Sequence, residues 1–132
     1  TFNPDGSLCF SHEPGVIDPK YYLTPAVKKY VLCPGTKNWH THIETDRKIA
    51  RTLLSTMGNH HRAGVDNYIT VSKKPLVLRQ LSDREALRLM GYPDDFKIAV
   101  SSMQTLRQAG NSIVVDVMIA IVKQLYKTEV FN

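Results

Sequence analysis

The pattern of apolar and polar residues changes character at Leu81. Before it, the segments "KIARTLLST" (48–56), "NYITV" (67–71) and "LVLRQL" (76–81) are rich in residues that favour strands. The first two are separated by "MGNHHRAG" (57–64), whose glycines and asparagine are typical of turns. Together these segments predict a small, twisted, mostly antiparallel sheet.

The residues before these strands predict a short helix and a loop. Thr24 is suited to cap a helix whose first position is Pro25, and "CPG" at 33–35 supplies the stop. The following segment, "TKNWHTHIETDR" (36–47), is polar and has no period. We therefore expect it to be a loop.

After Leu81 the sequence is typical of helices. Ser82 followed three residues later by Glu85 predicts a capping box, and Gly91 is expected to end this first helix. Its apolar side would be formed by Leu81, Ala86, Leu87 and Met90, with Arg84 and Arg88 facing polar partners. A second helix is expected to begin at a cap on Ser101 or Ser102 and to end at Gly110.

A third helix is predicted from 111 to 126, and its apolar residues lie on nearly every side. Such a helix must be enclosed by protein or by lipid. About ten apolar residues interrupted by Asp116 are fewer than the roughly 20 that a membrane span needs. We therefore expect the helix to pack against a large partner that this chain does not contain.

Composition adds limits to this picture. The chain has 132 residues and 42% hydrophobic content, which is enough for the core of one globular domain. Cys9 and Cys33 form no CxxC pair, and the sequence shows no signal peptide and no apolar run of membrane-spanning length. A reducing cytoplasm is the expected setting.

The positive charge is concentrated in the middle of the chain. Residues 20–80 carry eleven basic and three acidic side chains, whereas residues 1–19 have a net charge of −3 and residues 81–132 a net charge of 0. The middle segment also holds four of the five histidines and the only tryptophan. Such a cluster indicates either a phosphate-binding surface or merely a soluble basic face.

Two stretches of the second half carry a family resemblance. "RQLSDREALRLMGYPDDF" (79–96) and "QTLRQAGNSIVVDVMIAI" (104–121) resemble the ninth and tenth motifs of DNA (cytosine-5) methyltransferases, especially those of bacterial restriction-modification systems. The matching motif positions include Arg79, Arg84, Glu85, Arg88, Gly91, Pro93, Gln108 and Gly110. The resemblance implies a DNA target-recognition domain over 1–80 and a helical segment over 81–132 that joins it to a catalytic domain.

The resemblance continues upstream, where Thr52-Leu53 looks like the Thr-Leu pair of the family's target-recognition domain. In the family, loops on either side of this pair touch DNA bases, and they correspond here to about 37–47 and 55–62. Amides, imidazoles and threonines suit base edges, and basic side chains suit phosphates or guanine. The candidate DNA-binding residues are Lys37, Asn38, Trp39, His42, Arg51, Thr52, Ser55, Asn59, His60 and Arg62, with Lys48 as a further phosphate candidate.

The resemblance also implies chemistry that this chain does not supply. Family members use a cysteine in a Pro-Cys motif, a glutamate and S-adenosylmethionine to methylate C5 of a flipped cytosine. This sequence has no Pro-Cys, no Glu-Asn-Val and no glycine-rich cofactor turn, so the chain alone is expected to be inactive. Asn111 and Ser112 correspond to positions beside the cofactor pocket. The expected fold class is α+β, with the C-terminal helices packed on an absent Rossmann-like catalytic domain.

Three alternatives remain open at the level of sequence. The chain could be a non-catalytic DNA-binding or regulatory module, or the small subunit of a naturally split methyltransferase. It could also self-associate through its apolar C-terminal helix. A zinc site is disfavoured, because "HTH" (40–42) and "HH" (60–61) lack the usual ligand spacing.

Overall fold

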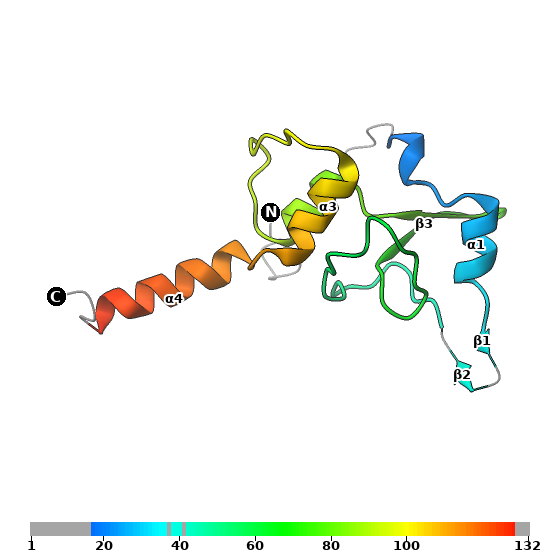
Figure 1. Cartoon of the computed structure of the whole chain (residues 1–132), viewed down its shortest axis with the longest axis horizontal. Helices are drawn as coiled ribbons and strands as arrows, with labels where there is room; N and C mark the ends of the chain where they lie inside the picture. The colour runs from blue at the N-terminus through cyan, green and yellow to red at the C-terminus, as the bar shows by residue number, and fades with distance from the viewer. Residues whose placement is uncertain (1–16, 37, 41, 129–132) are drawn as a thin grey trace.

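The computed structural model describes residues 17–36, 38–40 and 42–128 as an α+β fold (Figure 1). In chain order its elements are η1 (Pro19–Tyr21), α1 (Pro25–Val31), β1 (Gly35–Thr36), β2 (Trp39–His40), β3 (Tyr68–Lys73), β4 (Leu76–Gln80), α2 (Asp83–Leu89), α3 (Ser102–Asn111) and α4 (Val115–Lys127).

The strands β3 and β4 form an antiparallel hairpin, as predicted. Tyr68 pairs with Gln80 and Thr70 with Leu78, and a bulge lies between Thr70 and Ser72. Single bridges extend the hairpin on both sides, from Tyr22 to Arg79 and from Thr45 to Tyr68. The helix α1 is capped by the Thr24 side chain and has Pro25 at its first position, which confirms that prediction.

The predicted strand at 48–56 is wrong. This segment has no strand pairing, and the side chain of Asn67 takes the place of a neighbouring strand: it accepts from Arg51 N at 2.8 Å and donates to Arg51 O at 3.1 Å. Leu53 and Met57 are buried in the helical core. Tertiary packing therefore overrides the local preference for strand.

The expectation that 36–47 is entirely loop also needs correction. The two-residue strands β1 and β2 pair antiparallel, with Gly35 opposite His40 and Thr36 opposite Trp39. Gly35 has φ of 106°, a conformation that glycine adopts readily because it has no Cβ. This small hairpin projects from the body at the end opposite α4 (Figure 1).

Two buried clusters hold the fold together. The larger one joins the irregular segment after Arg51 to α2 and α3 and consists of Leu53, Met57, Leu81, Ala86, Leu87, Met90, Leu106 and Ala109. The smaller one joins α1 to the first strand of the hairpin and consists of Val31, Ala63 and Tyr68. Both clusters meet the hairpin at the end where Tyr68 pairs with Gln80, so helices hold this end of the sheet.

The helix α2 begins and ends as the sequence predicted. Ser82 Oγ accepts from Glu85 N at 3.3 Å, and Glu85 Oε2 accepts from Ser82 N at 2.8 Å, which completes the capping box. Leu87 and Met90 are buried. Gly91, just past the end of the helix, has φ of 84°, the left-handed conformation expected at this position.

The helix α3 is capped by Ser101 but does not end at Gly110, because it continues to Asn111. Gly110 has a different role from the predicted one. A Cβ atom at Gly110 would lie 2.3 Å from Leu54 C and 2.3 Å from Ser55 N. The glycine therefore allows the backbone of 54–55 to lie directly against α3.

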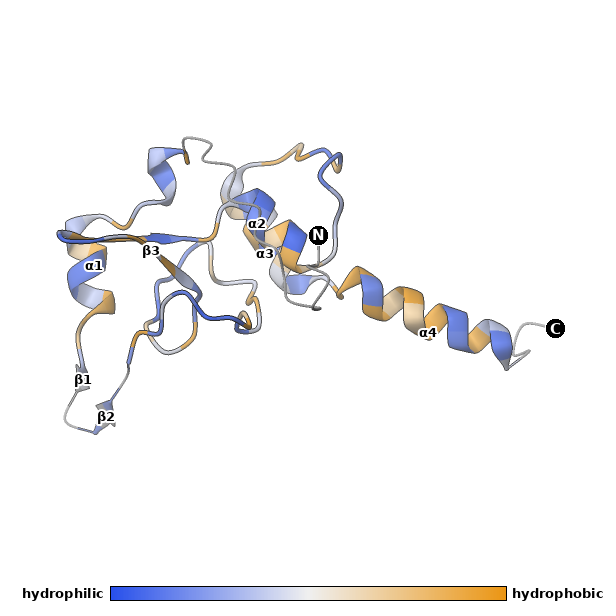
Figure 2. Cartoon of the chain, turned by 180° about the vertical axis from the view of Figure 1, so that it is seen from behind, coloured by the Kyte–Doolittle hydropathy of each residue, from blue (hydrophilic) through white to orange (hydrophobic). Residues whose placement is uncertain are grey.

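The helix α4 begins at Val115, later than predicted, because Ser112 turns the chain. The N–H and the Oγ of Ser112 both donate to Ala109 O, at 3.2 Å and 2.8 Å. The helix projects away from the body (Figures 1 and 2). None of its residues is buried. Its exposed apolar residues include Val117, Met118, Ile119, Ile121, Val122 and Leu125.

By length and composition alone, one stretch of the described residues is a candidate membrane span: the 26 residues Ser102–Lys127. The fold divides this stretch at Ser112, and α3 is packed against the core. The 13 residues of α4 extend about 20 Å, less than the roughly 30 Å of a bilayer's hydrocarbon core.

Candidate nucleic-acid interface and its joint

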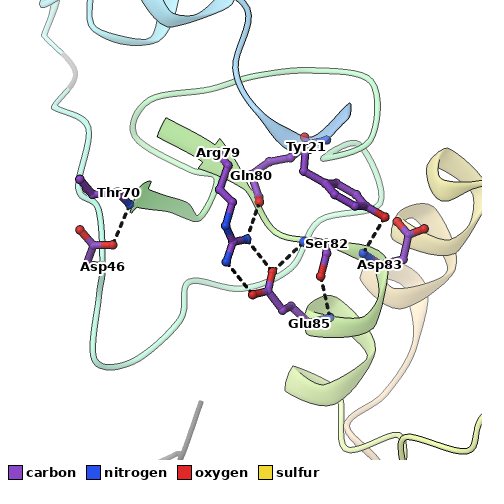
Figure 3. Close-up of polar contacts among 8 residues, drawn as sticks. All are labelled: Tyr21, Asp46, Thr70, Arg79, Gln80, Ser82, Asp83 and Glu85. Atoms are coloured by element: carbon purple, nitrogen blue, oxygen red, sulfur yellow. Dashed lines mark hydrogen bonds and ion pairs between the residues drawn. The ribbon is translucent and has the colours of Figure 1, made fainter. Parts of the chain in front are cut away.

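An ion pair connects the sheet to the helical segment. Arg79 on β4 donates to Glu85 on α2 through two parallel bonds, Nη1 to Oε2 at 2.7 Å and Nη2 to Oε1 at 2.8 Å (Figure 3). Arg79 is only 1% exposed, and its Nη1 also donates to Gln80 O at 3.1 Å. Because Glu85 also accepts from Ser82 N, one carboxylate serves both the helix cap and the joint.

The electrostatics of Glu85 reflect these bonds. Burial by itself would raise the pKa of Glu85, but the hydrogen bonds from Arg79 and from the Ser82 backbone outweigh it and hold the pKa below its ordinary value. Glu85 is therefore ionised at neutral pH and keeps the buried guanidinium neutralised.

A tyrosine contributes a second connection at the same place. The hydroxyl of Tyr21 accepts from Asp83 N at 3.4 Å (Figure 3). The same hydroxyl lies 3.5 Å from Ser102 Oγ. The 3-10 helix η1, α2 and α3 thus meet around one hydroxyl group.

The acidic turn after α2 is fastened by the two arginines that the sequence assigned to polar partners. Arg84 donates to Pro93 O at 3.3 Å and to Phe96 O at 2.9 Å. Arg88 pairs with Asp94 at 2.6 Å, and this bond lowers the pKa of Asp94. The predicted role of these arginines is confirmed.

The loop before the irregular segment is anchored to β3. Asp46 Oδ1 accepts from Thr70 N at 2.8 Å (Figure 3). Thr70 Oγ1 lies 3.0 Å from Thr45 Oγ1. Burial opposes ionisation of Asp46, but the bonds from Thr70 hold its pKa below the ordinary value. This anchor fixes where the first candidate DNA loop leaves the sheet.

Arg51 links the two candidate DNA loops. Its guanidinium donates to Gly64 O, and its Nη2 lies 3.3 Å from Glu44, which also pairs with Arg47. Both terminal nitrogens of the Arg51 guanidinium are therefore engaged within the chain, whereas its buried Nε has no partner among the described residues. These contacts hold the first candidate loop to Gly64, just after the second one.

The second candidate loop is built around a buried carboxylate. Asp66 Oδ2 accepts from Arg62 N at 2.7 Å, while the Arg62 guanidinium donates to Thr56 Oγ1. Burial raises the pKa of Asp66, although the Arg62 hydrogen bond and nearby cations oppose the shift. Burial also lowers the pKa of His61, against the attraction of Asp66.

The remaining predicted site residues differ in exposure. Lys37 lies outside the described residues, and the side chain of Trp39 is likewise not described. The exposed candidates are Asn38, His42, Thr52, Asn59, His60 and Asn111; the half-buried ones are Arg51, Ser55, Arg62 and Ser112. Among the motif positions, Arg88, Pro93 and Gln108 are exposed.

Several residues that shape this region were not foreseen from the sequence. Asn67 holds the backbone of Arg51, Asp66 holds the second loop through Arg62, and Tyr30 on α1 lines a cleft beside that loop. The turn-like "VDNY" (65–68) was the available signal for the first two. Over the described part of the chain, no group of three or more His, Cys, Asp or Glu side chains is arranged to hold a metal.

Comparison with known proteins places this geometry in one family. The family model described as C-5 cytosine-specific DNA methylase matches residues 22–127. Among curated relatives, the type II methyltransferase M.SsoII of Shigella sonnei is 42% identical over 118 residues, covering 85% of this chain and 30% of M.SsoII. The type II methyltransferase M.NgoBI of Neisseria gonorrhoeae is 32% identical over 108 residues, covering 77% and 32%.

A solved structure agrees at the level of fold. The Dnmt2 methyltransferase of S. pombe has a TM-score of 0.64 and 21% identity, covering 86% of this chain and 38% of that one. The chain spans about a third of the length of the two curated relatives named. It belongs to the C-5 cytosine-specific DNA methylase family, of the bacterial restriction-modification type.

Proposed function

We propose that residues 20–80 form the DNA-reading part of a cytosine-5 methyltransferase and that residues 81–132 join this reader to the catalytic part. The observation that carries the proposal is the joint itself. The buried pair of Arg79 and Glu85 fixes the last strand of the basic segment to the first helix of the segment with the family's motifs. Such a fixed connection would hold the DNA-reading loops at a constant position relative to the catalytic residues.

The charge distribution supports a DNA-facing role for the first part. Exposed lysines lie on α1, directly after the first candidate loop and at the tip of the β3–β4 hairpin, at Lys29, Lys48, Lys73 and Lys74. The carboxylates of the same segment are engaged within the chain: Asp46 with Thr70, Asp66 with Arg62, and Glu44 with two arginines. Among the described residues these four lysines form no salt bridge, whereas Arg47, Arg51 and Arg62 are each paired with a carboxylate. Phosphate groups would therefore meet the lysines first.

The second part would serve the catalytic domain. In the proposed complete enzyme, S-adenosylmethionine supplies the methyl group, and the catalytic cysteine comes from residues that this sequence does not contain. Asn111 and Ser112 stand at the turn between α3 and α4, where they would line the edge of the cofactor pocket. The apolar surface of α4 would pack on the catalytic domain, in cis or in trans, in a bacterial cytoplasm.

The salt dependence of DNA affinity tests the reading role. If about six phosphates are engaged, log affinity for a duplex should fall with log salt at a slope of about −5 between about 50 and 200 mM salt. Fluorescence anisotropy of a labelled duplex titrated with the chain measures this slope. A slope near zero would contradict the proposal.

A pair of lysine variants localises the surface. Lys48→Met, directly after the first candidate loop, should weaken binding and reduce the slope by about one unit. Lys127→Met, at the far end of α4, removes the same charge and should leave the slope unchanged. Equal effects of the two variants would mean that net charge, and no particular surface, governs binding.

A further inference from the structure

An open cleft of about 540 Å³ lies between α1 and the second candidate loop. One wall comes from Ala26, Val27 and Tyr30, and the other from the run Asn59, His60, His61 and Arg62. The two walls are some thirty residues apart in sequence and meet only in the fold. Tyr30 is 67% exposed, so a large aromatic side chain stands at the cleft.

Both walls of the cleft are held in place. Val31, next to Tyr30, is 1% exposed and packs with Ala63 and Tyr68, which connects α1 to the loop side. Lys28 Nζ donates to Leu76 O at 2.9 Å, which fastens α1 to the β3–β4 hairpin. The cleft is therefore formed in the free chain rather than assembled by a ligand.

The polar lining of the cleft consists of groups that can donate hydrogen bonds. These are a phenol hydroxyl, a carboxamide, two imidazoles and a guanidinium, and no carboxylate is among the lining residues. The adjoining acid, Asp66, is buried; it accepts from Arg62 N, and its Oδ1 lies 3.8 Å from Arg62 Nη2, so it offsets part of the guanidinium charge. The adjoining helix α1 contains two lysines and no acidic residue.

A donor-rich, carboxylate-free cleft on a basic surface suits a ligand that is anionic and only accepts hydrogen bonds. A DNA phosphate has these properties, and tyrosine, asparagine and arginine side chains are among its usual partners. A base edge, by contrast, presents both donors and acceptors. The amide and imidazole groups of the lining can also accept hydrogen bonds, as a base edge requires, but the Arg62 guanidinium and the lack of a carboxylate among the lining residues favour the charged backbone of the duplex.

We propose that this cleft binds a phosphate of the DNA backbone and that Tyr30 donates a hydrogen bond to it. The inference rests on the proposed reading function and deepens it. It adds α1 to the DNA surface, and it gives Asn59 and His60 a positioning role in place of the base contacts that the sequence suggested. A phosphate held here would set the register of the duplex against the loops.

Tyr30→Phe tests the proposal, because it removes one hydroxyl from an exposed side chain and keeps the ring. Affinity for duplex DNA should fall by about tenfold, the effect of losing a hydrogen bond to a charged group. The fall should be the same for duplexes of unrelated sequence, because a phosphate carries no sequence information. Tyr126→Phe on α4, where the tyrosine is 72% exposed, is the matched control and should bind as the unaltered chain does.

A second pair of variants places a negative charge in the cleft. Asn59→Asp should weaken binding more than Tyr30→Phe does, because the new carboxylate would face the phosphate. Gln104→Glu adds the same charge at an exposed position of α3 and should have a much smaller effect. Circular dichroism of each variant verifies that the fold is retained.

The possible outcomes separate this inference from the proposed function. If Tyr30→Phe and Asn59→Asp bind as tightly as the unaltered chain while Lys48→Met binds weakly, the cleft is not a DNA site and the reading function stands. If the loss in Tyr30→Phe differs between duplex sequences, the cleft contacts bases and the phosphate assignment is wrong. If the unaltered chain does not bind duplex DNA, both proposals fail together.

Discussion

Arg79→Met is expected to lower the free energy of unfolding by about 3–5 kcal/mol, as loss of one partner from a buried ion pair typically does. The variant leaves the Glu85 carboxylate in a mostly buried place without two of its hydrogen bonds. Methionine fills much of the space of arginine, so the loss reflects charge more than volume. Urea unfolding followed by circular dichroism measures the change.

Two further variants isolate the buried charge as the cause. Arg88→Met removes an arginine from an exposed pair, in which the side chains are 47% and 66% exposed, and should cost far less. The double variant Arg79→Met with Glu85→Met should recover a large part of the lost stability, because no unpaired charge then remains. Equal losses in Arg79→Met and Arg88→Met would contradict this account.

Acid provides an independent check on the same pair. The folded-state pKa of Glu85 lies below its ordinary value, so its contribution to stability is fully present above that ordinary value. The contribution is lost as the pH falls through the folded-state pKa. Glu85→Gln should therefore show a weaker loss of stability on acidification than the unaltered chain shows.

Gly110→Ala is expected to destabilise the fold by more than the usual 1–3 kcal/mol of overpacking, about 3 kcal/mol or more. In an ordinary helix the substitution would gain about 1 kcal/mol. Here the new methyl group would lie 2.3 Å from backbone atoms of Leu54 and Ser55, which no side-chain rotation can relieve. The clash should therefore outweigh the gain.

Gln108→Ala is the matched control for Gly110→Ala. It lies in the same helix at an exposed position and should change stability by no more than about 0.5 kcal/mol. Thermal unfolding of both variants measures the difference. A Gly110→Ala variant as stable as the unaltered chain would show that α3 does not lie against 54–55 as the structure has it.

The position of Gly110 also connects stability to DNA binding. Residues 54–55 lead directly into the second candidate loop, so moving them away from α3 should move that loop as well. The motif helices thus support the reader mechanically while carrying no DNA contact of their own in this account. Gly110, one of the family's motif positions, would therefore help to position the DNA-reading loop.

The parts of the fold that local chemistry determines were predicted from sequence. Ser82 and Glu85 cap a helix through their own neighbours, and Thr24 with Pro25 does the same for α1, so both predictions are confirmed. The strand predicted at 48–56 is wrong because a distant side chain, Asn67, satisfies its backbone, and because Leu53 is drawn into the helical core. Nothing within that segment signals either contact.

In the candidate site, too, features set by local sequence could be predicted and features set by long-range packing could not. The arginines of α2 could be assigned to polar partners because helix periodicity places them on the outer face. The cleft beside Tyr30 could not be predicted, since it depends on how α1 packs against a loop thirty residues away. Gly110 was misread for a related reason: a glycine that ends a helix and one that permits a close approach look alike in sequence.

The most direct test of the central claim is selection of duplexes by the chain from a pool with randomised sequence, followed by sequencing of the retained fraction. If residues 20–80 read DNA, one short sequence containing cytosine should be enriched, and Lys48→Met should lower the retained amount without changing that sequence. A retained fraction with the same composition as the starting pool would contradict the claim that this chain is the reader.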